Sequence, residues 1–241
     1  KRIQEKDGIE TFANQIILCI RDLRSTPEDY RDIQSEVING DCRSTNLPDE
    51  YFDFVFTSPP YLNNYDYADR TRLETYLMGF ANSWGEITEK IRDKLIISAT
   101  TQISRTEYNI NDIISNELKD VNIKVAKEIQ SKVTELSEIR NTKGGKKSYD
   151  IMVGGYFNDL TLSLIDTYRT MKKGSHYQLV LGDSAPYGIH IPTETYIGEI
   201  GLGIGFKEYS VLELRKRGGK WKDNPQRHSV PLRESILTLK K

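Results

Sequence analysis

Apolar residues recur every three or four positions in some stretches of the chain and form short unbroken runs in others. The first pattern is typical of helices that bury one face, and the second is typical of buried strands. Helices are predicted over 9–24, from about 111 to 144, over 156–171, and from 192 to the glycines before 206. Strands are predicted over 36–42, 52–57, 178–184 and 207–214. The chain therefore mixes helices and strands.

The run over 52–57 leads directly into Ser58-Pro59-Pro60-Tyr61. Each proline lacks an N–H group, fixes its own φ near −65° and pushes the residue before it into an extended conformation. Ser58 and Pro59 are therefore expected to be extended, with few local donors for their carbonyl oxygens. The pattern predicts a rigid turn after a central strand, carrying a hydroxyl, a free proline carbonyl and an aromatic ring.

This set of groups suits methyl transfer to the exocyclic amino group of a base. The lone pair of that nitrogen is delocalised into the ring, so the amine is a poor nucleophile. The Ser58 hydroxyl and the Pro59 carbonyl could accept its two N–H groups and aim the lone pair at a methyl donor, while Tyr61 stacks on the base. Orientation and fixed dipoles would then supply most of the catalysis. The base would have to be flipped out of its duplex first.

Thr57-Ser58-Pro59-Pro60-Tyr61 resembles the catalytic motif of the amino-group DNA methyltransferases. The resemblance continues in Tyr61-Leu62-Asn63 and in Arg72-Leu73-Glu74, and in a closing segment over 233–240. It implies an α/β, Rossmann-like core with a helical insertion, S-adenosylmethionine as cofactor, double-stranded DNA as substrate and a role in a restriction-modification system. It implies Ser58, Pro59, Pro60 and Tyr61 as the catalytic residues.

Several alternatives stay open. The Ser-Pro-Pro-Tyr form is most common in cytosine-N4 enzymes, but some adenine-N6 enzymes share it. The motif could also be retained in a non-catalytic DNA-recognition subunit, and the substrate could be RNA. The motif could also be no more than a proline turn after a strand in an unrelated α/β protein.

The cofactor side of the site is only partly present in the sequence. Asp41 follows the predicted strand over 36–42, at the end where α/β sheets bind ligands, and the resemblance implies cofactor contacts from Asp41, Cys42 and Thr57. Asp41 could instead cap the next turn. The glycine-rich loop that normally holds the methionine end of the cofactor has no match. A chain segment outside these residues or a second polypeptide is expected to supply it, and the 241-residue chain alone is expected to bind the cofactor weakly.

Other candidate DNA contacts are spread along the chain. They are Asn63, Tyr65, Asp183, Ser184, Arg215, Lys216, Arg217, Lys220 and Trp221. The basic loop around Trp221 suits phosphate contacts and stacking, although it could be a solvated surface loop. The apolar stripe and lysines of 84–150 could position DNA, pack on the main domain or form a dimer contact.

Bulk properties set the remaining limits. A chain of 241 residues fits one domain with an inserted subdomain, and the predicted parts are 1–83, 84–150 and 151–241. The net charge of −1 gives no overall basic footprint, so nucleic acid would have to contact local patches. Two cysteines and isolated histidines suggest neither a disulfide framework nor a metal site. No apolar run approaches the ~20 residues that span a bilayer, so a cytoplasmic location is expected.

Overall fold

The computed structural model describes residues 7–30, 33–106, 108–142, 147–217 and 230–241. The chain divides into two compact units, residues 1–40 and residues 41–241. This division differs from the predicted parts 1–83, 84–150 and 151–241, which stay predictions.

The first unit contains helix α1 (Gly8–Ser25) and a short 3-10 turn, η1 (Glu28–Tyr30). The helix predicted over 9–24 is thereby confirmed. Asp7 caps its start by accepting a 2.8 Å hydrogen bond from the Ile9 amide. No residue of α1 is buried. The apolar stripe that predicted the helix is therefore exposed.

The strand predicted over 36–42 is wrong. Residues 33–41 follow no helix or strand pattern, and the chain first turns at Cys42. A strand needs a neighbour for its backbone groups, and no described strand pairs with this segment. A run of β-branched residues is therefore not enough by itself to form a strand here.

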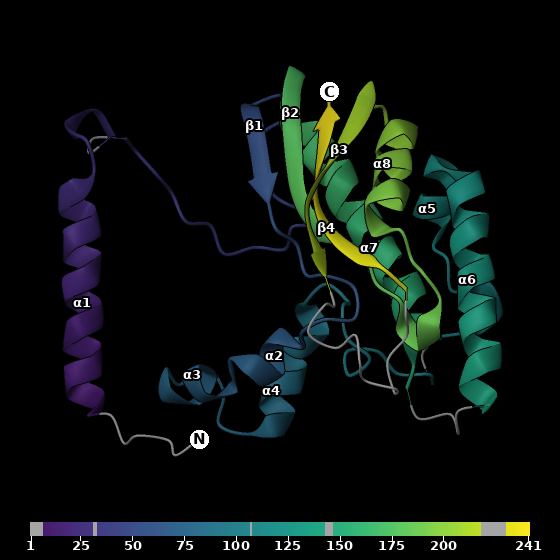
Figure 1. Ribbon diagram of the computed structural model, residues 1–241, viewed down its shortest axis with the longest axis horizontal. Coiled ribbons are helices and arrows are strands. Elements are labelled where there is room, and N and C mark those ends of the chain that lie inside the picture. Colours follow the sequence, from purple (N-terminus) through teal and green to yellow (C-terminus); the bar gives the residue numbers. More distant parts are fainter. Residues whose placement is uncertain (1–6, 31–32, 107, 143–146, 218–229) are drawn as a thin grey trace. The chain divides into compact units, whose positions relative to one another are not determined.

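The second unit is built on a four-stranded sheet in the order β1-β2-β4-β3 (Figure 1). The strands are β1 (Phe52–Thr57), β2 (Met171–Gly182), β3 (Glu208–Arg217) and β4 (Leu232–Lys240). Strand β1 runs parallel to β2, whereas β4 is antiparallel to both β2 and β3. The bounds predicted over 52–57 are confirmed residue for residue, but the prediction of a buried, central strand is wrong. In the described sheet β1 is an edge strand, and none of its residues is buried. The predictions over 178–184 and 207–214 locate β2 and β3 but miss the first residues of β2.

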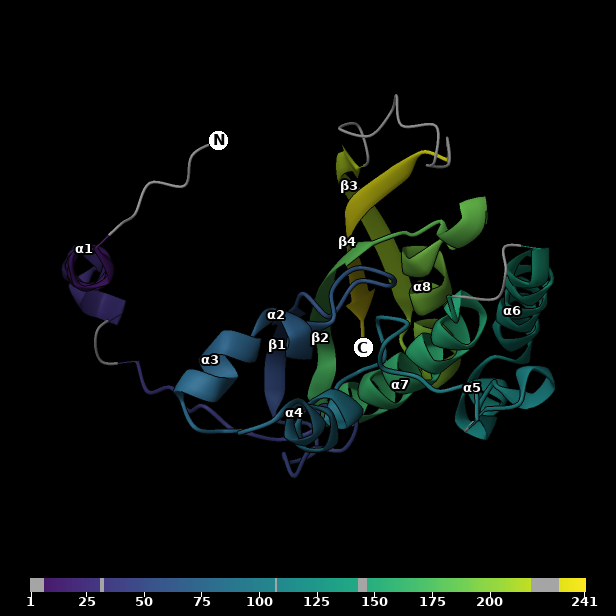
Figure 2. The same cartoon turned by 90° about the horizontal axis from the view of Figure 1, so that it is seen from below.

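Helices cover one face of this sheet in two layers (Figure 2). The inner layer is α7 (Tyr149–Thr170) and α8 (Thr193–Ile204), and the outer layer is α5 (Asn116–Val121) and α6 (Ile123–Thr142). One apolar core joins the sheet to both layers, with Tyr156, Leu179 and Leu237 fully or almost fully buried. The long helix predicted from about residue 111 is broken between α5 and α6 at Asn122, which has a φ of −154°.

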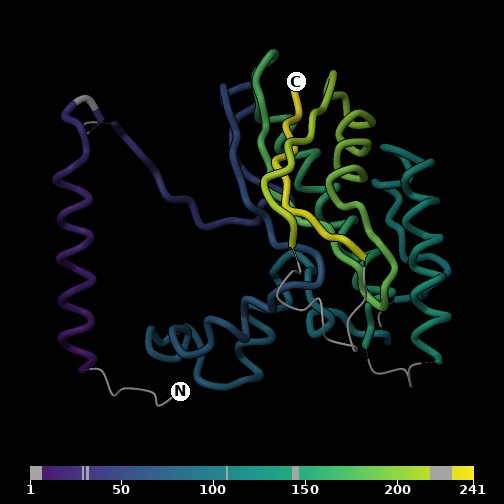
Figure 3. The backbone as a smooth tube through the Cα atoms, viewed as in Figure 1, coloured from purple at the N-terminus to yellow at the C-terminus, as the bar shows by residue number. Residues whose placement is uncertain are grey.

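The segment between β1 and α5 carries smaller elements beyond the carboxyl end of β1, and Figure 3 traces its path. They are α2 (Tyr67–Arg70), α3 (Arg72–Leu77), α4 (Trp84–Lys90) and the 3-10 turns η2 (Arg92–Lys94) and η3 (Ile110–Asp112). Another 3-10 turn, η4 (Pro186–Gly188), follows β2. Ala68, Ala81 and Ile87 form a small core of their own. None of the described helices has the length and apolar character to cross a membrane.

The glycines near residue 203 have structural roles. Gly205 ends α8 at a φ of +128°, and a Cβ on Gly201 would lie 2.5 Å from Leu239. The run belongs to a helix that ends before β3. It is therefore not a nucleotide-binding loop, because such a loop follows a strand and begins a helix.

Candidate active site

The Ser-Pro-Pro-Tyr turn follows the last residue of β1 directly. Ser58 is exposed. The Pro60 carbonyl accepts a 3.1 Å hydrogen bond from the Tyr156 hydroxyl, whereas the Pro59 carbonyl accepts none from any described residue. Burial raises the pKa of Tyr156, so its hydroxyl keeps its proton and remains a donor. The turn thus presents one hydroxyl and one unbonded carbonyl, as the sequence predicts.

Tyr61 is held from two sides. Its hydroxyl donates to Glu234 Oε1 at 3.0 Å, and the Arg217 guanidinium carbon lies 5.3 Å from the centre of its ring. Burial raises the pKa of the Tyr61 phenol, and a hydrogen bond from Ser58 opposes that rise. Tyr61 is half-buried and is not part of the interior core.

A cavity of about 410 Å³ lies beside the turn, between the sheet and α7. Ser58, Pro59 and Pro60 form part of its wall, and so do the cofactor candidates Cys42 and Thr57. The remaining lining residues are mostly apolar: Val55, Phe56, Ile96, Leu160, Ser163, Leu164, Thr167, Tyr177, Leu179 and Ile197. The cavity therefore brings the first three residues of the motif together with two of the three predicted cofactor residues, whereas Tyr61 is not among its lining residues.

Asp41 is next to this wall in sequence but is already paired. Its Oδ2 lies 2.8 Å from Nη2 of Arg43, and Nη1 of Arg43 lies 2.9 Å from Asp159 on α7. The Arg43 guanidinium holds the pKa of Asp41 below its usual range. A ligand at Asp41 would share the carboxylate with Arg43.

Asn63 and Tyr65 lie on the loop after the motif, and both are exposed. Asn63 adopts a left-handed φ of 58° and donates its amide to Ser98. The Tyr65 ring lies 5.1 Å from the Arg70 guanidinium. Asp66 anchors the loop through a 2.9 Å ion pair with Arg92. These contacts give the loop a defined shape with outward-facing polar groups.

Asp183 and Ser184 follow β2 but are only 2% and 5% exposed. The Asp183 carboxylate accepts from the Arg233 amide at 2.7 Å and lies 2.8 Å from His190 Nε2. Ser184 exchanges backbone hydrogen bonds with Ile191. Both residues fasten the turn after β2, so nucleic acid could reach them only after a rearrangement.

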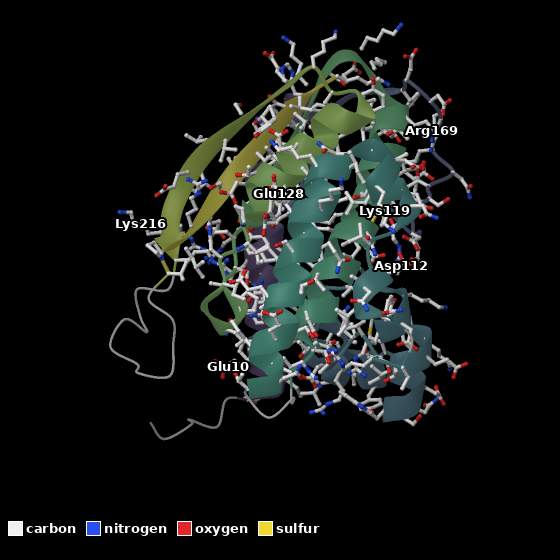
Figure 4. All side chains as sticks on the ribbon, turned by 90° about the vertical axis from the view of Figure 1, so that its right-hand side faces the viewer. Glu10, Asp112, Lys119, Glu128, Arg169 and Lys216 are labelled. Atoms are coloured by element: carbon white, nitrogen blue, oxygen red, sulfur yellow. The ribbon has the colours of Figure 1, made fainter. Side chains whose placement is uncertain are left out.

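The predicted basic loop is described only in part. Arg215 pairs with Glu234, Arg217 donates to the Asp183 carbonyl at 3.1 Å, and Lys216 is exposed near the end of β3 (Figure 4). Arg215 and Arg217 are therefore engaged near the motif. Lys220 and Trp221 lie outside the described residues.

The helical region over 84–150 carries its own ion pairs. Lys119 lies 2.9 Å from Asp112, and both are labelled in Figure 4. Lys132 pairs with Glu135 at 3.2 Å. The apolar stripe over 125–136 is buried in the common core, as expected for packing on the main domain. A role of this region in positioning DNA stays a prediction.

Glu234 lies near the motif but is not among the site residues that the sequence predicts. Glu234 lies opposite Gly182 in the β2–β4 ladder, which brings its carboxylate to Tyr61. Arg217, which the sequence predicts as a DNA contact, reaches the same ring from the end of β3. Only the order and register of the strands bring these distant residues together, and local sequence patterns do not specify that order.

Comparisons with known proteins identify relatives of one kind. Type II methyltransferase M.BsoBI of Geobacillus stearothermophilus is 26% identical over 263 residues, covering 100% of this chain and 50% of the relative. M.AvaI of Nostoc sp. is 27% identical over 167 residues, covering 68% of this chain and 33% of the relative. M.MvaI of Kocuria varians is 27% identical over 210 residues, covering 80% and 41%.

The chain thus spans half or less of the length of these relatives. No family model matches it, and no solved structure matches it. The resemblance to methyltransferases that the motif indicates is confirmed, because all three relatives are type II methyltransferases.

Proposed function

We propose that this chain forms the catalytic part of an S-adenosylmethionine-dependent DNA methyltransferase of a restriction-modification system. The observation that carries the proposal is the Ser58-Pro59-Pro60 turn, which lies in the wall of the 410 Å³ cavity with Ser58 exposed and the Pro59 carbonyl unbonded by described residues. The similarity to type II methyltransferases supports the same reading. The target is an exocyclic amino group, with cytosine N4 ahead of adenine N6.

Residues of this chain orient the amino group of the target base. Ser58 Oγ and the Pro59 carbonyl accept the two amine hydrogens, so the nitrogen lone pair is fixed toward the methyl donor. Tyr61 stacks on the base through its ring. The methylated amine releases its extra proton to solvent water, while the two oxygens act only as hydrogen-bond acceptors. A base reaches this turn only after it leaves the duplex.

The cofactor fits this site in part. S-adenosylmethionine supplies the methyl group when it is bound. The cavity offers apolar walls together with the Thr57 and Cys42 side chains, which suit a flat heterocycle with polar edges. No glycine-rich loop for the methionine end occurs in the 241 residues. This chain therefore contributes one part of the cofactor site, with Asp41 beside it.

The outer edge of β1 supports a proposal about where the rest of that site attaches. No described strand pairs with this edge. Phe54 and Phe56 are 52% and 58% exposed, so the face of β1 that carries them is also uncovered, although strands in parallel pairs are usually covered on both faces. We propose that a further strand, outside these 241 residues, pairs here and carries the glycine-rich loop. It belongs to a further segment of the same protein or to a second polypeptide. In each of these relatives, at least half of the residues lie outside the part that matches this chain.

The test is methyl transfer by the chain joined to the polypeptide that supplies the missing loop. Duplex DNA is incubated with labelled S-adenosylmethionine, and its nucleosides are then identified by mass spectrometry. We expect N4-methylcytosine. N6-methyladenine would change the target base and keep the reaction. No label on duplex DNA, while DNA still binds, would favour the non-catalytic recognition subunit; label on RNA in a competition assay would change the substrate.

A further inference from the structure

Tyr61, Glu234 and Arg215 form a hydrogen-bonded chain from three distant segments. The Tyr61 hydroxyl donates to Glu234 Oε1 at 3.0 Å, and Arg215 Nε donates to Glu234 Oε2. Glu234 stands opposite Arg215 in the β3–β4 ladder and opposite Gly182 in the β2–β4 ladder. The sheet therefore fixes the carboxylate, and the carboxylate fixes the phenol.

The ring of Tyr61 is held as well as its hydroxyl. Arg217 covers it at 5.3 Å from guanidinium carbon to ring centre, and Arg217 is itself tied to the Asp183 carbonyl at 3.1 Å. A Cβ on Gly182 would lie 2.3 Å from Nη1 of Arg217 and 2.9 Å from Cδ2 of Tyr61. Only glycine at that position leaves room for both groups. With Arg217 on one side, a base can stack only on the opposite face of the ring.

The direction of the hydrogen bonds follows from the charges. The Arg215 side chain lowers the pKa of Glu234, so the carboxylate is ionised at neutral pH and can only accept. The single phenol hydrogen of Tyr61 is therefore used by Glu234.

We propose that Glu234 is a positioning residue for the methylation site: by accepting the Tyr61 hydrogen it fixes the ring on which the base stacks. Arg215 keeps Glu234 in place. This inference rests on the proposed function for its catalytic meaning. The arrangement of the three side chains can be tested without it.

The kinetic test compares Glu234→Gln with Glu208→Gln in the complete enzyme. Glu208 pairs with Lys240 at 3.1 Å at the far end of the same β3–β4 pair of strands, so its variant removes a similar cross-strand ion pair away from Tyr61. We expect Glu234→Gln to lower kcat about 10- to 100-fold, the loss of one charge-assisted hydrogen bond, with KM for DNA almost unchanged. Tyr61→Phe should lower kcat by a similar factor. The double variant should be no slower than the slower single variant, because both break one chain.

A second measurement needs no turnover. In the 241-residue chain labelled with ¹³C in its tyrosine rings, the Tyr61 signal is assigned by its loss in Tyr61→Phe. We expect Glu234→Gln to shift and sharpen that signal as the ring is released, and Glu208→Gln to leave it in place. An unchanged Tyr61 signal in Glu234→Gln would overturn the proposed arrangement. If the complete wild-type enzyme transfers methyl groups but the two glutamate variants have equal kcat, the positioning role fails while the proposed function stands. If no methyl is transferred at all, the proposed function fails, and the signal still decides the arrangement.

Discussion

The buried hydroxyl of Tyr156 on α7 donates a 3.1 Å hydrogen bond to the carbonyl oxygen of Pro60. This bond ties the second proline of the turn to the helical layer. The first proline carbonyl remains for a ligand. The Pro60 carbonyl thus attaches the turn to α7, and this contact fixes the orientation of the neighbouring Pro59 carbonyl.

Removal of that hydroxyl should loosen the turn. In Tyr156→Phe, the Pro60 carbonyl loses its donor, and we expect the free energy of unfolding to fall by about 1 kcal/mol. Methyl transfer by the complete enzyme should fall several-fold, since the Ser58 and Pro59 oxygens are less well aligned. Urea unfolding and initial rates measure the two effects. Tyr209→Phe is the control, because it removes a 3.0 Å bond to Glu199 away from the turn. Equal rates for the two variants would contradict this role.

Loss of the Ser58 hydroxyl should affect the rate far more than stability. Ser58 is exposed, so Ser58→Ala should leave the free energy of unfolding within about 0.5 kcal/mol of the wild type. Methyl transfer should fall about 10²- to 10³-fold, as for the loss of one fixed polar group at a reacting centre. Ser104→Ala, at another exposed serine, is the matched control. A Ser58→Ala enzyme as fast as the control would remove the acceptor role.

The region before α7 is fastened by a partly buried ion pair. Arg105 Nη1 lies 2.7 Å from both carboxylate oxygens of Asp150, which is fully buried. Arg105→Ala leaves a buried carboxylate without its cation and should lower the free energy of unfolding by about 3–5 kcal/mol. Lys132→Ala, which breaks the partly exposed pair with Glu135, should cost less than about 1 kcal/mol. Chemical denaturation measures the free energy of unfolding of both variants. A similar small decrease in the two would show that the Arg105–Asp150 pair contributes little to stability.

Asp166 should contribute to stability at neutral pH and lose that contribution in acid. Burial acts to raise the pKa of Asp166, but hydrogen bonds from Thr45 and Arg169 outweigh it and hold the pKa below the ordinary 3.8. Because the folded-state pKa is the lower one, the contribution is complete above the unfolded-state value and disappears as pH falls through the folded-state value. Asp166→Asn should therefore destabilise the protein at pH 7 and flatten the acid limb of the stability curve. Urea unfolding between pH 7 and pH 3 measures this. Asp53→Asn, at a carboxylate that is 81% exposed and paired with Lys172, is the control. A parallel acid limb in wild type and Asp166→Asn would refute the linkage.

The β1 edge should make the isolated chain prone to self-association. Unpaired strand edges with exposed aromatic residues recruit other strands, and charged side chains on an edge oppose this. Phe54→Lys should therefore lower light scattering of the concentrated chain. Leu212 is 62% exposed on β3, an edge strand that already carries Arg215 and Lys216. Leu212→Lys should therefore lower the light scattering less than Phe54→Lys does. An equal decrease in light scattering with both substitutions would show that general surface hydrophobicity, and not the β1 edge, drives association.

The sequence predicts correctly those elements that depend only on neighbouring residues, such as caps, prolines and apolar spacing. The strand over 52–57 has the predicted bounds because an acidic turn precedes it and two prolines follow it. The helix over 9–24 likewise follows from its apolar spacing and its Asp7 cap. The turn after the strand has an exposed serine and a Pro59 carbonyl to which no described residue donates a hydrogen bond, in line with the expected lack of local donors.

Features that depend on distant partners could not be predicted in this way. The run over 36–42 has the composition of a strand but no described neighbour. Asn122 breaks the long helix because its side chain donates to the Glu199 carbonyl at 2.9 Å and accepts from the Val125 amide. The contact of Glu234 with Tyr61 arises from strand order. Composition and periodicity contain none of this information.

The Ser-Pro-Pro-Tyr turn follows the outermost strand of the sheet, and only one side of that strand is paired by described residues. A neighbour on the other side would reduce the fluctuations of β1 and, with them, those of Ser58 and Pro59. Docking of the proposed strand and binding of the base would then be thermodynamically linked. If the proposed strand docks on β1, we expect it to raise the affinity for the extruded base, and by reciprocity a bound base should raise the affinity for the strand by the same factor.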